Sequence, residues 1–162
     1  SYCECTDDLN RVCEGIEGAN GDTSILISNI ADNAAFFEIK PDYAKDVVCG
    51  FIRMNGQTVG VVANRTEIIG EDGKVAEKFE GLSAQGCEKA ASLVDFCDSF
   101  NIPVVTFTNV KGYKATMCQE KMLAKATAKL IYAFTNATGQ FTINNFINFF
   151  ITLSIIRSHL II

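Results

Sequence analysis

The chain has 162 residues, enough for one domain with one hydrophobic core. With 48% hydrophobic and 20% charged residues, its composition excludes a disordered chain. The net charge of -5 argues against a nucleic-acid partner, because affinity for nucleic acids comes mainly from neutralising phosphates. The single histidine, His159, lies near the end of the chain, so counting excludes a Ser-His-Asp or Cys-His arrangement within residues 1–138.

Seven cysteines are an odd number, at spacings that form no regular framework. Cys87 and Cys97 fall on apolar faces, where a free cysteine behaves as a small hydrophobic residue. A zinc site needs four convergent ligands, and the sequence has no C-x2-C pair; a metal site at Cys3, Cys5 and Cys13 is the remote alternative. We therefore expect reduced thiols, no resident metal and a cytoplasmic protein.

The first part of the chain predicts a linker and a short helix. Residues 1–22 are polar and rich in Gly, Asp and Glu, and we interpret them as a linker and N-terminal extension. Ser1 is preceded by neither a Met nor a signal segment, so we expect a processed chain or a fragment, and favour the fragment. Thr23 to Ile30 predicts a short helix followed by a turn, and Phe36, Phe37 and Ile39 form an apolar patch.

Two strands and a hairpin are predicted next. Val47 to Met54 has the composition of a strand, and Asn55-Gly56 is the strongest short-range signal for a hairpin turn. The second strand, Gln57 to Asn64, is nearly all apolar, which is typical of a strand covered on both faces. The charged, Gly-rich stretch from Glu67 to Gly81 predicts a surface excursion.

Two amphipathic helices are predicted around a further strand. Ala84 to Phe100 and Met117 to Thr135 carry apolar residues at helical spacing. In the second helix, the residues expected to face the core are Leu123, Ala126, Leu130, Ile131 and Phe134. Lys121, Lys125 and Lys129 form a stripe on the same helix, which we interpret as a solvated face. The alternative is an anion-facing rim, completed by Lys111 and Lys114, for an acyl-CoA phosphate or a carboxylate.

The stretch from Asn101 to Tyr113 organises these elements. Its short, β-rich apolar run has a proline only at its beginning, which indicates a buried strand. A helix-strand-helix order predicts a layered α/β domain with its ligand site at the loop after the strand. Because Gly112 lets the backbone approach a ligand closely, main-chain N–H groups there could stabilise a developing oxyanion.

Three blocks of sequence carry a resemblance to a known family. They are IADNAAFFEIKPDYAKDVVCGFIRMNGQTVGVVAN (residues 30–64), EKAASLVDFCDSFNIPVVTF (88–107) and AKLIYAFTNAT (128–138). Together they resemble the carboxyl-terminal half of biotin-dependent carboxyltransferase subunits, over roughly residues 23 to 138. These include the β subunits of propionyl-CoA and related acyl-CoA carboxylases and the α subunits of methylmalonyl- and glutaconyl-CoA decarboxylases. The resemblance implies a crotonase/ClpP-like β-β-α spiral domain, incomplete at its C-terminus.

The resemblance also implies a function. A carboxyl group would move between biotin, held on a partner biotin carboxyl carrier protein, and an acyl-CoA. The site would lie between subunits of a homo-oligomer that also contains an N-terminal carboxyltransferase domain, with a membrane decarboxylase partner as an open alternative. Gly112 and Tyr113 match the first oxyanion loop on the biotin side. Residues expected to face biotin or acyl-CoA are Asn109, Val110, Lys111, Lys114, Cys118 and Gln119.

The chain departs from the family in two places. The family's D-x-P-G-F-x-P-G loop keeps only its first Gly and an aromatic here, so the acyl group and the direction of transfer stay open. After Thr138 the Gly-Gly-Ala-Tyr-type turn that provides a second donor is replaced by an Ile/Phe/Asn-rich tail, residues 139–162. We hypothesise a frameshift or gene-calling artefact, with a membrane segment or an amphipathic docking helix as rivals. We also expect the sheet to be left with an unpaired edge.

Two functions follow from this interpretation. The first is a carboxyltransferase fragment that stabilises enolate-type oxyanions with backbone amides. The second is a non-catalytic binding or assembly module on the same fold, favoured by the missing second loop and by the lysines at 111 and 114.

Overall fold

The computed structural model describes residue 7 and residues 21–70, 72–110, 112–138, 140–144 and 152–156. In chain order, its elements are α1 (Thr23–Ile30), the 3-10 turn η2 (Asp32–Ala34), β1 (Phe36–Glu38), β2 (Val47–Met54), β3 (Gln57–Asn64), β4 (Glu67–Ile69), β5 (Val75–Lys78), α2 (Ala84–Ser99), β6 (Val104–Thr108), α3 (Met117–Asn136), β7 (Gln140–Asn144) and β8 (Thr152–Ile156). The expected helices and the three expected strands are all present, within a few residues of their predicted bounds.

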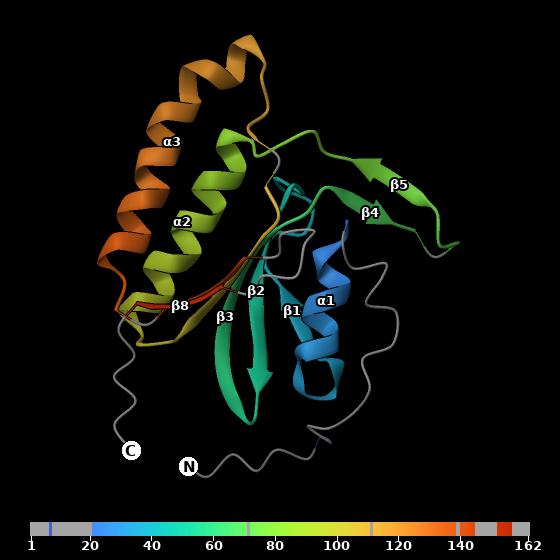
Figure 1. Ribbon diagram of the computed structural model, residues 1–162, viewed down its shortest axis with the longest axis vertical. Helices are drawn as coiled ribbons and strands as arrows, with labels where there is room; N and C mark the ends of the chain where they lie inside the picture. The colour runs from blue at the N-terminus through green and yellow to red at the C-terminus, as the bar shows by residue number, and fades with distance from the viewer. Residues whose placement is uncertain are drawn as a thin grey trace.

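The central sheet has the strand order β1-β2-β3-β6-β7-β8. β3, β6 and β7 run parallel to one another, whereas β1, β2 and β8 each pair antiparallel with their neighbour. β4 and β5 form a separate two-stranded ribbon that projects from the body (Figure 1). The excursion predicted for Glu67 to Gly81 is therefore at the surface as expected, but it contains a ribbon that was not predicted.

The hairpin between β2 and β3 forms where the Asn-Gly pair predicts it. Asn55 and Gly56 both have positive φ, 50° and 78°, as a tight two-residue turn requires. The buried carboxylate of Asp32 accepts hydrogen bonds from both of their N–H groups, at 3.0 Å and 2.7 Å. The turn that follows α1 thus fixes the hairpin from outside the sheet.

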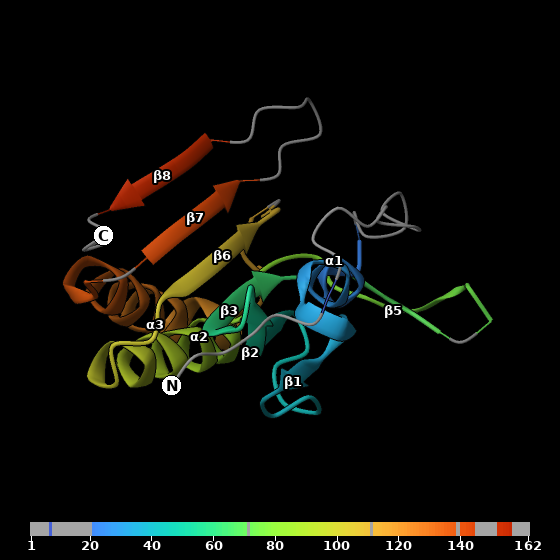
Figure 2. The same ribbon diagram turned by 90° about the horizontal axis from the view of Figure 1, so that it is seen from below.

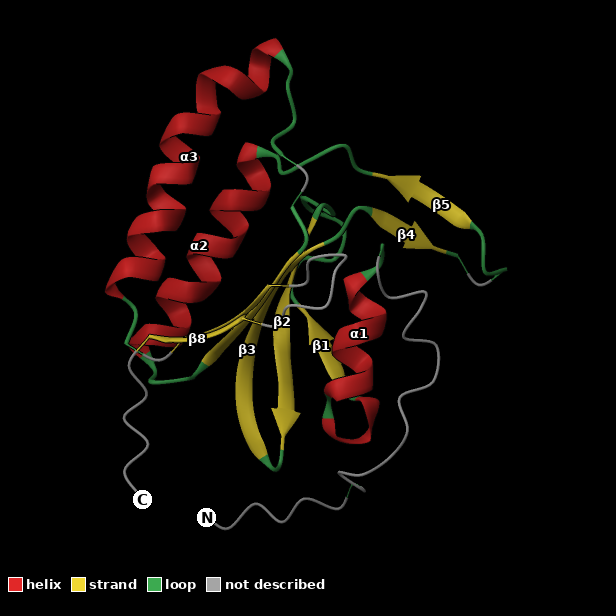
Figure 3. Ribbon diagram, viewed as in Figure 1, coloured by secondary structure: helices red, strands yellow, loops and turns green. Residues whose placement is uncertain are grey.

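Helices cover both faces of the sheet (Figures 2 and 3). α2 and α3 pack on one face, where Val47, Val62 and Val104 meet Val94 of α2. α1 lies on the other face, where Ile27 packs against a second set of strand residues, Val48, Ile52, Val59, Val61 and Ala63. The period-two alternation of the strands divides these residues between the two clusters, and β3 is covered on both faces as predicted.

Some expected core positions were wrong. Ile131 of α3 is 61% exposed, and Ala133 is buried in its place. The buried face of α3 centres on Ala126 and Ala133, seven residues apart, and Ile131 lies about 200° around the helix from Ala133. Phe100, the last residue of the helix predicted from Ala84, is also 64% exposed.

The expectation of an unpaired edge next to β6 was also wrong. β7 pairs in parallel with the whole of β6, from Val104 with Gln140 to Thr108 with Asn144. The carboxyl ends of β3, β6 and β7 therefore meet at one edge of the sheet. Among the described residues, no helix is long and apolar enough to span a membrane.

Lys89 of α2 holds the irregular loop that leads into β2. Its ammonium donates to the main-chain oxygens of Lys40, Tyr43 and Val47 at 3.0, 2.9 and 2.8 Å. The residue is 6% exposed, and burial lowers the pKa of its ammonium group. Three carbonyl acceptors satisfy all three ammonium protons. Lys89 therefore acts as a template: it holds this loop against α2 and so fixes the position of Asp46, the residue before β2.

Candidate functional site

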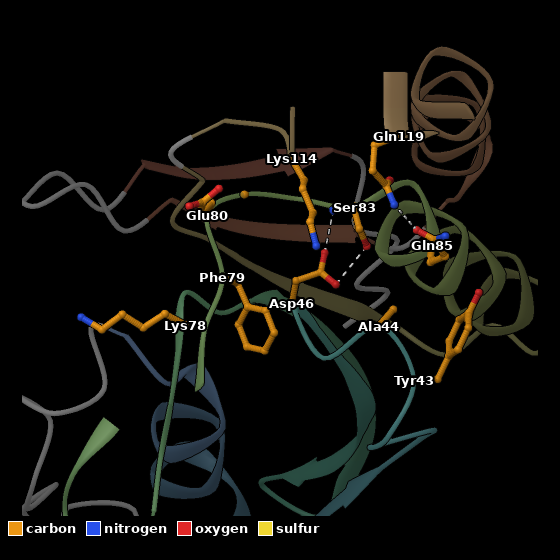
Figure 4. Close-up of a pocket in the computed structure, with 11 residues that line it drawn as sticks. Tyr43, Ala44, Asp46, Lys78, Phe79, Glu80, Ser83, Gln85, Lys114 and Gln119 are labelled. Atoms are coloured by element: carbon orange, nitrogen blue, oxygen red, sulfur yellow. Dashed lines mark hydrogen bonds between the residues drawn. The ribbon is translucent and has the colours of Figure 1, made fainter. Parts of the chain in front are cut away.

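The candidate site lies at the edge of the sheet where parallel strands end and helices begin. α2 and α3 both start at this end, each after a short segment that returns from the sheet edge (Figure 1). A cavity of about 420 Å³ opens between these segments (Figure 4). Its described lining residues are Tyr43, Ala44, Asp46, Lys78, Phe79, Glu80, Gly81, Ser83, Gln85, Lys114 and Gln119. The position agrees with the rule that ligands bind beyond the carboxyl ends of parallel strands.

The segments that enter the two helices pair with each other at Leu82 and Tyr113. The N–H of Leu82 donates to the carbonyl of Gly112 at 3.0 Å, and the N–H of Lys114 donates to the carbonyl of Leu82 at 2.9 Å. In this parallel arrangement the N–H and C=O of Tyr113 point away from Leu82. Among the described residues no acceptor is found for the Tyr113 N–H, so it is available to a ligand.

Gly112 makes this approach of the two segments practicable. Its φ of +148° lies in a region that side chains rarely adopt. The approach is close at Gly81 as well, where an added Cβ would lie 2.7 Å from the Gly112 oxygen. Glycine is thus required at both positions, one for its backbone conformation and one for lack of space.

Asp46 and Ser83 form the floor of the cavity. The carboxylate of Asp46 accepts hydrogen bonds from the Ser83 N–H at 2.7 Å and from the Ser83 hydroxyl at 3.0 Å. The Ser83 hydroxyl in turn accepts from the Gly86 N–H at 3.0 Å and so caps α2. Asp46 therefore places its negative charge at the positive end of a helix, where that charge is stabilised.

Gln119 of α3 joins the starts of the two helices. Its side-chain oxygen accepts from the Ala84 N–H at 2.7 Å, and its nitrogen donates to the side-chain oxygen of Gln85 at 2.8 Å. Gln119 thus caps α2 from the neighbouring helix while it lines the cavity. Its amide holds the cavity wall and does not point freely to a ligand.

The predicted site residues are only partly brought together. Lys114 and Gln119 line the cavity, and Gly112 and Tyr113 form the segment beside it. Asn109 and Val110 directly follow β6, and neither is a lining residue of this cavity; Val110 lines a second, smaller one. Cys118 is exposed on α3 and is not among the lining residues. Lys111 lies outside the described residues. The stripe of Lys121, Lys125 and Lys129 is exposed, in agreement with a solvated face.

Sequence reasoning missed three parts of the site. Ser83 carried a detectable signal, since serine before a helix predicts an N-cap. Asp46 and Gln85 carried none, because their position depends on packing between distant segments. The described residues contain no group of three or more His, Cys, Asp and Glu side chains placed to hold a metal ion. Besides main-chain N–H groups, the cavity lining offers the Lys114 ammonium, the Glu80 carboxylate and the Tyr43 hydroxyl for chemistry.

An antiparallel hairpin, parallel strands and covering helices define a crotonase-like α/β domain. The family model for the carboxyl transferase domain matches residues 10–143, and the chain belongs to this family. The predicted resemblance and fold are therefore confirmed.

Curated relatives agree with this assignment. The mitochondrial propionyl-CoA carboxylase beta chain of Homo sapiens is 43% identical over 114 residues, which cover 70% of this chain and 20% of the relative. The methylmalonyl-CoA carboxyltransferase 12S subunit of Propionibacterium freudenreichii subsp. shermanii is 36% identical over 125 residues, 76% of this chain and 22% of the relative. The chain thus spans about a fifth of the length of these relatives.

Solved structures resemble the chain in fold. A transcarboxylase 12S structure with methylmalonyl-CoA and methylmalonic acid bound superposes with a TM-score of 0.73 at 33% identity, covering 89% of this chain and 28% of that one. The beta subunit of geranyl-CoA carboxylase from P. aeruginosa gives a TM-score of 0.63 at 26% identity, covering 75% and 21%.

Proposed function

We propose that this domain forms the biotin side of a carboxyltransferase site, at which a carboxyl group moves between biotin and an acyl-CoA. The Tyr113 N–H, with Gly112 beside it, donates to the biotin carbonyl oxygen as negative charge develops there. Biotin supplies the ureido nitrogen that carries the carboxyl group. The domain itself binds and orients biotin and stabilises the developing negative charge with its main-chain N–H groups.

One observation carries the proposal: the bridge between Leu82 and Tyr113 turns the Tyr113 N–H away from Leu82. The bridge fixes the residues on either side of this donor, so the N–H is preorganised and its orientation costs little free energy when charge develops. The described cavity residues include no histidine, which also favours electrostatic stabilisation over general acid–base catalysis.

The proposed partners follow from the relatives. Propionyl-CoA, methylmalonyl-CoA and geranyl-CoA appear in the names of similar proteins, which supports an acyl-CoA substrate. One solved relative is described as a hexamer assembly, which supports a homo-oligomer. An N-terminal carboxyltransferase domain would complete each subunit. Biotin would arrive on a carrier protein.

Calorimetry with biocytin tests the proposal. Tyr113→Pro removes the N–H, whereas Tyr113→Phe keeps it and serves as the matched control. We expect Tyr113→Pro to weaken biocytin binding roughly three- to tenfold, the value of one hydrogen bond, with little change in Tyr113→Phe. Equal affinities in both variants would contradict the donor role. A chain that binds no biocytin would instead support the non-catalytic assembly module.

A further inference from the structure

We propose that the Lys114 ammonium binds the carboxylate that this domain transfers. The inference rests on the proposed function and adds to it a side chain that recognises the transferred group. It makes a small carboxylate the ligand of the cavity.

The main chain places Lys114 directly after the proposed oxyanion donor. Its own N–H is fixed by the Leu82 carbonyl at 2.9 Å, so its Cα position is set by the same bridge that orients Tyr113. The side chain then extends into the cavity, with its ammonium end toward Asp46 (Figure 4). The Tyr113 N–H and the Lys114 ammonium thus belong to neighbouring residues of one fixed segment.

The charges around the cavity leave this ammonium without an ion pair. Asp46 is satisfied by Ser83 and by the start of α2, and Lys78 pairs with Glu67 at 3.1 Å. Glu80 also lines the cavity, but no carboxylate of the described residues, Asp46 and Glu80 included, lies within 4.0 Å of the Lys114 nitrogen. A cation that faces an open cavity without a partner is a binding group for an anion.

The chemistry of the site favours a carboxylate over a phosphate. Phosphate sites usually gather several donors or a glycine-rich cradle, whereas Lys114 offers one point charge on a flexible stem. At about 420 Å³ the cavity is large enough for a small organic acid.

NMR titration of the full chain with malonate, a small dicarboxylate, tests the inference. Lys114→Met removes the charge and keeps most of the stem, and Lys121→Met makes the same change in net charge on the exposed face of α3. We expect Lys114→Met to weaken malonate binding roughly tenfold or more, and Lys121→Met to change it less than twofold. Lys114→Arg, which keeps the charge, should retain affinity within about threefold.

Equal weakening by Lys114→Met and Lys121→Met would overturn the inference, because it would indicate a general charge effect. Absence of malonate binding to the unmodified chain would overturn it as well. Neither result affects the proposed oxyanion donor, which is tested separately by biocytin and the Tyr113 variants. Loss of malonate binding in Lys114→Met together with unchanged biocytin binding in Tyr113→Pro would support the carboxylate site and reject the oxyanion role.

Discussion

The side-chain amide of Asn64, at the end of β3, forms two hydrogen bonds with the main chain of Asn109. The Asn109 N–H donates to Asn64 Oδ1 at 2.6 Å, and Asn64 Nδ2 donates to the Asn109 carbonyl at 2.8 Å. The amide thus continues the pairing of β3 with β6 beyond their last paired residues, Ala63 and Phe107. This clamp fixes the start of the loop that contains Gly112.

Asn64→Ala should therefore loosen that loop. The loss of two partly buried hydrogen bonds should lower the free energy of unfolding by about 2 kcal/mol, measured by urea denaturation. Asn29→Ala, an asparagine on α1 away from the loop, is the control, and it should leave the Asn109 amide's hydrogen exchange unchanged. If Asn64→Ala also left that exchange unchanged, the clamp would have no role in ordering the loop.

Removal of the buried ammonium of Lys89 should destabilise the domain strongly. In Lys89→Met the carbonyls of residues 40, 43 and 47 lose their shared donor. We expect a loss of roughly 3 kcal/mol in the free energy of unfolding, measured by denaturation. Lys74→Met, on the exposed ribbon, removes the same charge and should change stability by less than about 0.5 kcal/mol. Equal stability of the two variants would contradict the template role.

Stability should fall in alkaline solution because of buried thiols. Burial raises the pKa of Cys49 from 9.0 to about 12 and that of Cys97 to about 11. Since the unfolded thiols ionise first, the stability they contribute is fully present below pH 9 and is lost as the pH rises through 11 to 12. The lowered pKa of Lys89 acts in the opposite direction, so the comparison must isolate one thiol. Cys49→Ala should show a smaller loss between pH 9 and 11 than the unmodified chain, and an identical slope would refute the assignment.

Thr106 offers a stabilising substitution. Its hydroxyl is buried and has no hydrogen-bond partner among the residues that the structure describes. It lies beside a mostly apolar cavity of about 80 Å³ between the sheet and the two helices. Thr106→Val keeps the shape and removes the unsatisfied group, so we expect about 1 kcal/mol of added stability in thermal unfolding. A lower melting temperature in Thr106→Val would show that the hydroxyl has a partner that the substitution removes.

Local signals explain what the sequence predicted. Asn55-Gly56 predicted the turn between β2 and β3. The helical spacing of apolar residues after Ala84 and after Met117 predicted α2 and α3, and both helices are present. The ribbon was missed because β5 is exposed, β4 is only partly buried, and neither strand has hydrophobic alternation. β1 has only three residues, too few for a periodic pattern.

The sequence predicted the loop of the candidate site but not all the residues that line its cavity. The position of Gly112 after a buried strand located the loop, since parallel strands place ligands at their carboxyl ends. Asp46 and Gln85 reach the same cavity through tertiary packing, which no short stretch of sequence encodes. The origin of residues 139–162 stays a hypothesis; an in-frame Gly-Gly-Ala-Tyr-like continuation one base away in the source DNA would support an artefact.

The central claim is that a main-chain amide of this domain donates to a cofactor carbonyl. The most direct measurement follows the Tyr113 amide proton by NMR while biocytin is added to the full chain. The account predicts a downfield shift that saturates with the affinity measured by calorimetry. A Tyr113 amide that stays in place while biocytin binds would contradict it.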